Sequence, residues 1–232
     1  MLKETAMRFL LLGALLAACS SSSTGKVREG EVSRYAVTMP PDAEPGMSIT
    51  WRYASNQRDR FAVFEETLAC VGETPEHVTI EWRRLLTNRD QGVTAARFDR
   101  SGQLTGAWIG PPGALGKPLK VVAKGPQLDR VEREVRRRAR QLGFTPKSVE
   151  ILGERETGTV KTPAGSFPCE IYHLKVTLPL NESTVTLCYA KQPLPLDRLV
   201  RMEWKLPRGG FSNLELVKYG SDGAEPTLRI PK

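Results

Sequence analysis

Apolar and polar residues alternate along several segments of the chain, which is the pattern of a β-strand with one buried face. Polar or charged residues separate the apolar positions in the four clearest segments, which are Ile49, Trp51 and Tyr53; Val78, Ile80 and Trp82; Tyr172, Leu174, Val176 and Leu178; and Val200, Met202, Trp204 and Leu206. Turn-forming sequences at residues 99–102, 207–210 and 220–223 lie between such segments. Strands do not alternate with helices, so the pattern predicts a mainly β fold with an antiparallel sheet of about nine or ten strands.

One segment, residues 126–142, follows a helical period instead. Pro126 and Asp129 suit the first turn of a helix, and Gly143 is placed to end it. Apolar residues recur at steps of three and four, at Leu128, Val131, Val135, Ala139 and Leu142. This stripe is narrow, so we expect an amphipathic helix that packs on the sheet and leaves much of its surface exposed.

The polar face of the predicted helix is rich in arginine, and part of it is balanced by acids. Three acids precede an arginine by four residues, in the pairs Asp129 with Arg133, Glu132 with Arg136 and Glu134 with Arg138. Arg130, Arg137 and Arg140 have no such partner within the helix. Either this is a solvated, salt-bridged face, or Arg130, Arg133, Arg137 and Arg140 form a patch that faces lipid head groups or an acidic partner.

The first 18 residues are predicted to be a signal peptide. Lys3 and Arg8 form a positively charged start, and residues 9–18 are an uninterrupted apolar run. As a helix this run would rise only about 15 Å, roughly half the hydrocarbon thickness of a bilayer. A cleaved signal peptide therefore fits better than a membrane span. Met7 would serve equally well as the start, because Arg8 alone supplies the positive charge.

The apolar run ends in Leu16-Ala17-Ala18-Cys19, which resembles the lipobox of bacterial lipoproteins. The resemblance implies cleavage before Cys19, a diacylglyceryl group on its sulfur and a further acyl chain on its new amino group. Two or more acyl chains hold a protein at a membrane, whereas a single chain binds only marginally. In the sorting rule of enteric lipoproteins, a serine such as Ser20 permits export to the outer membrane. We therefore expect the periplasmic face of the outer membrane, with the inner membrane as the alternative.

Residues 19–30 are predicted to be a flexible tether because serine, threonine and glycine dominate them. Residues 31–232 are long enough for a single β-rich domain with its own core. The whole chain has a net charge of +8, and removing Lys3, Glu4 and Arg8 with the signal peptide leaves +7. In the envelope the available anions are lipid head groups, cell-surface polymers and acidic proteins, so nucleic acid is not an expected partner.

Three cysteines remain once Cys19 carries lipid, and an exported protein meets an oxidising environment. Cys169 and Cys188 fall on the same side of a hairpin that the sequence predicts around residues 179–182. We therefore predict a disulfide between Cys169 and Cys188. The simplest hairpin register offsets the two positions, so a bond from Cys70 to one of them stays open.

The sequence shows no constellation of residues typical of an enzyme. It lacks a Gly-x-Ser-x-Gly elbow, a phosphate-binding glycine loop and a His-Glu-x-x-His motif. His77 and His173 stand alone, and no cysteine pair has the spacing of metal ligands. Glu65 and Glu66 are adjacent on a predicted strand and so point to opposite faces. We therefore expect a non-enzymatic protein with no catalytic residues, no metal and no cofactor.

The C-terminal half resembles a group of uncharacterised bacterial envelope proteins. The similarity rests on residues 154–172, with the turn Thr162-Pro163-Ala164-Gly165 ahead of Phe167 and Cys169, and on the later segments 189–195 and 199–200. That group is similar in architecture to LolA, LolB and LppX, which hold lipid or acyl chains against a concave face. The resemblance implies a curved sheet that forms a half-barrel. Tyr189 stands where the group frequently has tryptophan, and residues 196–198 replace its glycine-rich turn, so no binding residues are carried over.

Two functions are compatible with these features. The first is a lipid-anchored scaffold or interaction component that presents its sheet or its arginine-rich helix to other envelope proteins. The second is a carrier that binds a lipid or acyl chain on the concave face. A carrier needs an apolar cavity of several hundred Å³ that opens to solvent. A scaffold would fill the concave face with side chains such as Trp51, Trp82 and Trp204. We expect the scaffold.

Overall fold

The structure is a computed structural model that describes residues 31–33, 37, 39–40, 42–57, 60–86, 89–123, 129–141, 144–206 and 209–230. The predicted signal peptide, Cys19 and the tether at residues 19–30 lie outside the described residues. No helix in the described ranges is long and apolar enough to cross a membrane.

Twelve strands form one sheet in the order β1-β7-β6-β5-β4-β3-β2-β12-β11-β10-β9-β8. They are β1 (Glu31–Ser33), β2 (Ser48–Gln57), β3 (Arg60–Glu73), β4 (His77–Leu86), β5 (Arg89–Asp99), β6 (Leu104–Gly110), β7 (Lys117–Val122), β8 (Ser148–Thr162), β9 (Gly165–Thr177), β10 (Glu182–Ala190), β11 (Leu199–Lys205) and β12 (Phe211–Gly220). β1 pairs with β7 in parallel, and the other neighbours are antiparallel. The mainly β, antiparallel class is as predicted, but the strand count is higher, because the short strands β1 and β7 show no clear alternation.

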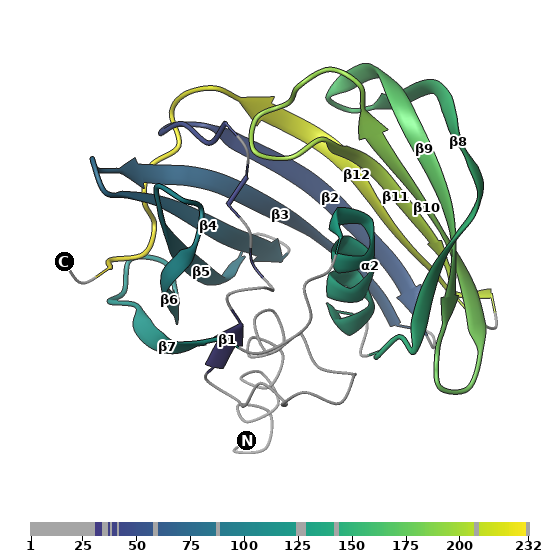
Figure 1. The fold of residues 1–232 in the computed structure, drawn as a ribbon, viewed down its shortest axis with the longest axis horizontal. Helices are drawn as coiled ribbons and strands as arrows, with labels where there is room; N and C mark the ends of the chain where they lie inside the picture. The colour runs from purple at the N-terminus through teal and green to yellow at the C-terminus, as the bar shows by residue number, and fades with distance from the viewer. Residues whose placement is uncertain are drawn as a thin grey trace.

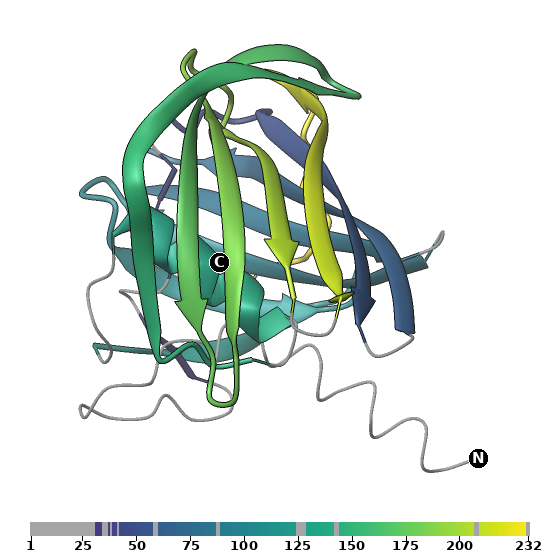
Figure 2. The same ribbon diagram turned by 90° about the vertical axis from the view of Figure 1, so that its right-hand side faces the viewer.

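The sheet is open and strongly curved, with β1 and β8 as its two edges. β2–β7 form one wall and β8–β12 the other, and both curve around a helix on the concave side (Figure 1). The second view shows β8–β12 side by side, in green to yellow, with the helix behind them (Figure 2). β12 joins the two walls by pairing with β2, with Leu214 opposite Tyr53. This long-range pairing makes the walls one continuous surface.

The concave face of the sheet is filled with large apolar side chains. Trp51 and Trp204 are 1 % and 0 % exposed, and Trp82 packs against the same core. The indole Nε1 of Trp51 donates to the carbonyl oxygen of Leu199 at 2.7 Å, and that of Trp204 donates to Ser183 Oγ at 2.9 Å. Both buried N–H groups are therefore satisfied, as a stable core requires. The alternating apolar positions found in the sequence point to this side.

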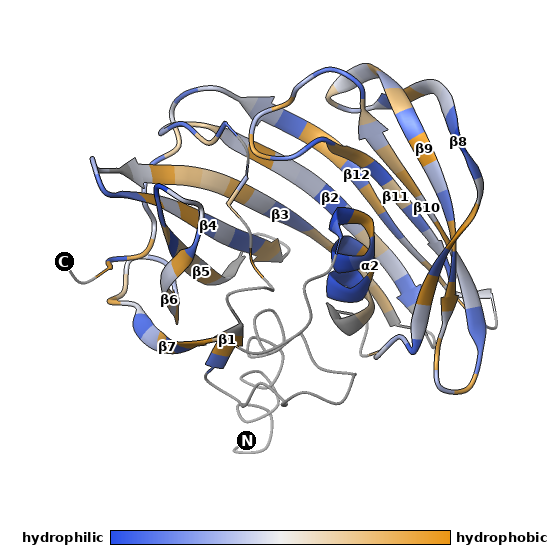
Figure 3. Ribbon diagram, viewed as in Figure 1, coloured by the Kyte–Doolittle hydropathy of each residue, from blue (hydrophilic) through white to orange (hydrophobic). Residues whose placement is uncertain are grey.

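Helix α2 (Arg130–Gln141) lies against the concave face, a mostly hydrophilic helix beside the apolar segments of the strands (Figure 3). It begins at Arg130 and not at the predicted Pro126, because Asp129 is the cap: its Oδ1 accepts the backbone N–H of Glu132 at 2.8 Å. Val135 and Ala139 are buried as predicted, but Glu134 and Arg138 are buried beside them. The helix therefore leaves less of its surface exposed than expected, because its buried face includes charged residues that lie outside the apolar stripe.

The convex face carries a smaller core under the C-terminal segment. Leu228 is buried with Val93 and Ala95, and Trp108 packs against them. Glu81, which is fully buried, accepts the backbone N–H groups of Thr227 and Leu228 at 3.0 and 2.9 Å. This carboxylate fastens the end of the chain to β4.

The predicted disulfide is absent, because Cys169 and Cys188 are separate buried thiols, as is Cys70. In the β9–β10 register Cys169 lies opposite Ala190, and Cys188 lies opposite Ile171. The two cysteines are therefore diagonal neighbours, whose Cβ atoms are typically about 7 Å apart. A disulfide needs about 4 Å between Cβ atoms, so the offset explains the free thiols.

Candidate functional site

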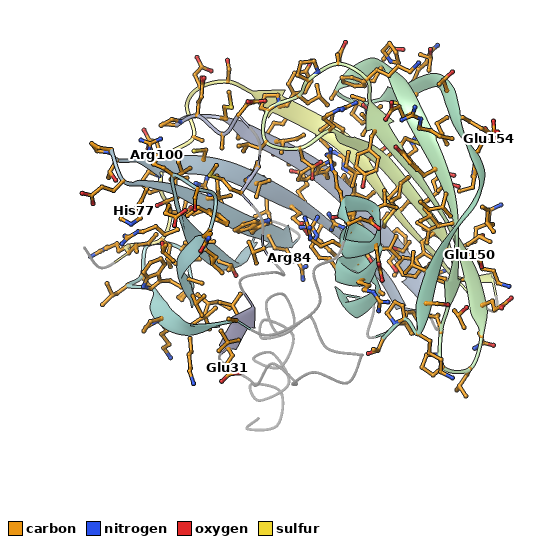
Figure 4. The ribbon with its side chains drawn as sticks, in the orientation of Figure 1. Glu31, His77, Arg84, Arg100, Glu150 and Glu154 are labelled. Atoms are coloured by element: carbon orange, nitrogen blue, oxygen red, sulfur yellow. The ribbon has the colours of Figure 1, made fainter. Side chains whose placement is uncertain are left out.

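Five charged side chains meet where α2 packs on the sheet, and we call them the helix–sheet ion cluster. They are Glu66 of β3, Arg84 of β4 and Glu134, Arg137 and Arg138 of α2. Alternation along β3 turns Glu66 to the concave side, while its neighbour Glu65 points outward and pairs with Arg52. Arg84 reaches into the space between the strands and α2 (Figure 4).

Glu66 is the centre of the cluster. Its Oε2 accepts Arg138 Nη1 at 3.0 Å, and its Oε1 accepts Arg137 Nη1 at 3.2 Å. Arg84 Nη2 lies 3.8 Å from the same Oε2, within ion-pair range. The Glu66 side chain is 3 % exposed and that of Arg138 is 0 % exposed. The strand and the helix are thus joined by charge-assisted hydrogen bonds away from water, where such bonds are strong.

Glu134 completes the cluster from within the helix. Its Oε1 accepts Arg138 Nε at 2.8 Å, and its Oε2 accepts Arg137 Nε at 3.0 Å. Arg137 and Arg138 each bind both Glu66 and Glu134, so neither arginine depends on a single partner. This double use fixes both guanidinium groups against the concave face.

The pKa values of both carboxyl groups show how strongly the arginines act. Burial raises the pKa of Glu66, but the charges of Arg138, Arg137 and Arg84 outweigh it and lower the pKa to about 2. For Glu134, burial is likewise outweighed by Arg137 and Arg138, and the pKa is again lowered to about 2. Both groups are ionised at neutral pH and are therefore poor proton donors or acceptors.

Arg84 is the least satisfied member of the cluster. Two carboxylates face three guanidinium groups, which leaves one positive charge in excess. Burial lowers the pKa of Arg84, and its Nε and Nη2 have no hydrogen-bond partner in the described part of the chain. Its guanidinium stacks over the Phe64 ring at 4.5 Å, which offsets part of the cost of burial.

A second contact fixes the first turn of α2. Arg130 forms an ion pair with Asp197, which precedes β11, and its guanidinium lies 4.6 Å from the ring centre of Tyr189. Burial raises the pKa of Tyr189 well above its ordinary value. Arg136 pairs with Glu132 inside the helix, at 2.7 Å, as the spacing predicted.

The arginines of the helix are thus distributed differently from the sequence expectation. Arg130 and Arg137, expected to lack partners, are paired by Asp197 and Glu66, which are distant in the sequence. The expected i,i+4 pair of Glu134 with Arg138 is present. The backbone N–H of Arg133 bonds to the Asp129 carbonyl, and the side chain of Arg140 lies outside the described residues.

Sequence reasoning missed Glu66 and Arg84 as members of a site, although a signal was present. Glu66 occupies an apolar position in the alternation that includes Phe64 and Leu68. Arg84 follows Ile80 and Trp82 in the same way on β4. A charge at a position that should face the core needs a buried partner. Two such charges of opposite sign on neighbouring strands indicate an ion pair.

The remaining candidate residues do not form a chemical site. His173 Nε2 lies 3.4 Å from Glu156, and His77 Nδ1 lies 3.9 Å from Glu76. Across the described ranges, no group of three or more histidine, cysteine, aspartate or glutamate side chains is placed to hold a metal ion. The helix–sheet ion cluster is therefore the candidate site, and what it does is hold α2 against the sheet by buried ion pairs.

No protein-family model matches the sequence, and no curated protein is significantly similar to it. Among solved structures, one described as an exported protein with a YmcC-like fold, from Bacteroides fragilis, is 13% identical, with 80% of this chain and 100% of that chain covered and a TM-score of 0.36. A hypothetical protein from Chlamydia trachomatis is 10% identical, with 82% and 94% covered and a TM-score of 0.45. A structure described as a lipoprotein, from Parabacteroides distasonis, is 14% identical, with 79% and 99% covered and a TM-score of 0.33. Similarities of this size support no inference about function.

Proposed function

We propose that this chain is a non-enzymatic lipoprotein of the bacterial envelope, anchored through Cys19 on the periplasmic side of the outer membrane, where it acts as a scaffold or interaction component. The sequence Leu16-Ala17-Ala18-Cys19 after an apolar run supports the anchor. The domain beyond the tether would meet other envelope proteins with its outer surfaces.

The occupied concave face is the observation that carries this proposal. Trp51, Trp204 and their apolar neighbours fill it, and α2 lies over them. The helix is held there by Glu66 and Arg130, each through ion pairs. Removing one partner from a buried ion-pair network destabilises a protein by about 3–5 kcal/mol. Displacing the helix would therefore carry a large free-energy cost. A face closed in this way suits a scaffold better than a carrier.

A carrier of an acyl chain is the second candidate, and Arg84 is the observation that favours it. Its guanidinium lies on the concave side with an excess positive charge and two nitrogen atoms without acceptors in the described part of the chain. The carboxylate of a fatty acid would satisfy such a group. This binding would require the acyl chain to displace side chains that are now packed together.

Crosslinking in cells tests the two candidates against each other. A photoreactive residue is placed at Glu154, on the exposed edge strand β8, and another at Met202, inside the concave face. If the chain is a scaffold, we expect a defined protein adduct at position 154 and no lipid adduct at position 202. Lipid adducts at position 202, together with acyl lipid in extracts of the purified protein, would overturn the scaffold in favour of the carrier.

A further inference from the structure

Several hairpin turns of the sheet lie at the same end, which we call the hairpin end. The register places Gln57 opposite Arg60, so β2 and β3 turn there. β12 begins beside the end of β2, and the end of β11 lies beside the start of β12. The β9–β10 turn and the start of β8 follow at the same level, since Thr177 pairs with both Glu182 and Ser148. The hairpin end is thus one rim of the half-barrel.

Large apolar side chains are exposed along this rim. All seven lie in the β6–β7 or β9–β10 turn or within five residues of a strand end: Leu180 at 90 % exposure, Phe61 at 69 %, Leu115 at 66 %, Ile151 at 50 %, Leu152 at 40 %, Val63 at 39 % and Leu85 at 38 %. A single exposed leucine is ordinary on a protein surface, but a concentration at one end marks an interaction site. Tyr219, at the opposite end of β12, instead packs against Phe167.

The chain enters the domain from this same end. β1 runs parallel to β7, with Glu31 opposite Lys120 and Ser33 opposite Val122. β7 starts at Lys117, opposite Ile109, after the β6–β7 turn at the hairpin end. Glu31, the first residue after the tether, therefore lies at the end of β1 that is nearer the hairpin end. Residues 20–30 span at most about 40 Å when extended, which keeps the rim near any lipid on Cys19.

We infer that the hairpin end rests on a lipid surface, with Leu180 and Phe61 inserted among the head groups. This inference takes the direction of the membrane from the anchor at Cys19, so in that respect it rests on the proposed function. The turns of one rim can touch a flat bilayer together, although they are spaced around an arc. A protein partner would instead need a contiguous patch of roughly 800 Å².

Charge at the rim agrees with an anionic membrane surface. Lys147 and Lys205 are exposed beside the turns, against Glu150 near the start of β8. Lys175 is paired with Glu182 at 2.8 Å and adds no net charge. The excess is small, so the apolar side chains supply most of the binding, and anionic lipid adds to it. Basic residues near an anionic surface strengthen membrane binding.

Vesicle flotation tests the inference without the anchor. The chain from residue 19 carries Cys19→Ser, so it cannot be acylated, and it is mixed with vesicles of phosphatidylethanolamine and phosphatidylglycerol. We expect it to float with the vesicles, and we expect Phe61→Ser with Leu180→Ser to weaken partitioning at least about tenfold. Tyr219→Ser, at the opposite end, is the matched control and leaves partitioning unchanged. Thermal unfolding verifies that each variant is folded.

A tryptophan placed at position 180 gives a second readout. Brominated acyl chains quench tryptophan that reaches the hydrocarbon boundary, so Leu180→Trp predicts added quenching that Tyr219→Trp does not show. Absence of flotation, equal loss in the Tyr219→Ser control, or no added quenching would each overturn the inference. If a photoreactive residue at position 180 formed a protein adduct in cells, the hairpin end would bind a protein partner and not the membrane, which would also overturn the inference. Acylation of Cys19 is measured separately by mass, so failure of the anchor and failure of the rim are distinguishable.

Discussion

Arg138 of α2 donates to Glu66 of β3 at 3.0 Å, across 72 residues of sequence, and both side chains are withdrawn from solvent. This pair is one of the contacts that fix the helix to the sheet, beside those of Arg137 with Glu66 and Arg130 with Asp197. Arg138 also binds Glu134 within its own helix. The position of α2 over the concave face thus depends on Glu66, which lies 72 residues before Arg138, together with the ion pair of Arg130 with Asp197.

Replacing Glu66 tests whether the ion cluster holds the helix in place. Glu66→Gln keeps the shape of the side chain but leaves the three arginines with one carboxylate. We expect a loss of about 3–5 kcal/mol in the free energy of unfolding, because an uncompensated buried charge remains. Urea unfolding followed by circular dichroism measures this loss.

The neighbouring residue is the control for this experiment. Glu65 points away from the core, and its pair with Arg52 is partly exposed. Glu65→Gln should therefore change the free energy of unfolding by less than about 1 kcal/mol. Equal losses in the two variants would show that the ion cluster does not fix the helix.

Acid should weaken the protein through the same carboxyl groups. The pKa of Glu66 and of Glu134 is about 2 in the folded chain, against an ordinary value of 4.5. A group whose pKa is lowered by folding stabilises the protein above its unfolded pKa, and this contribution is lost as the pH falls. We expect the free energy of unfolding to fall between pH 4.5 and 2.

The Glu66→Gln variant separates this effect from other carboxyl groups in the protein. It should lose stability with acid less steeply than the natural chain, because one titrating group is gone. Unfolding measured at several pH values gives the two slopes. Parallel slopes would mean that Glu66 is not protonated differently in the folded and unfolded states.

The C-terminal segment should loosen when Glu81 is removed. Glu81→Ala leaves the backbone N–H groups of Thr227 and Leu228 without their carboxylate acceptor. A hydrogen bond to a charged group contributes about 1.5–3 kcal/mol, so amide exchange near residues 226–230 should accelerate roughly tenfold or more. Hydrogen–deuterium exchange read by mass spectrometry follows these amides. Glu76→Ala, which removes an exposed carboxylate just before β4, should leave their exchange rates as they are.

Thiol counting tests whether the cysteines are reduced. In the Cys19→Ser chain we expect three reactive thiols after unfolding without reductant, from Cys70, Cys169 and Cys188. Before unfolding they should react slowly, because burial raises the pKa of Cys188 to about 12 and shields all three. Titration with a thiol reagent, with and without denaturant, gives both values. A single reactive thiol would mean that a disulfide exists despite the offset register.

The alternating strands could be predicted because alternation is a local property. Ile49, Trp51 and Tyr53 were expected on the buried side, and they are 0, 1 and 3 % exposed. Opposite orientations for Glu65 and Glu66 also followed from the period of a strand. The helix could be located from its apolar spacing, but its start was placed too early, since only the structure shows Asp129 acting as the cap.

What the sequence by itself determined is the mainly β class, the buried side of the main strands and the place of one helix, because residues two to four apart decide these features. The tertiary structure alone decided that α2 is held by Glu66 and Asp197, that β12 closes onto β2, and that Cys169 and Cys188 stand diagonally. Each of these depends on which distant residues meet and in what register. That choice is made by packing and buried charge over the whole sheet, which no local pattern records.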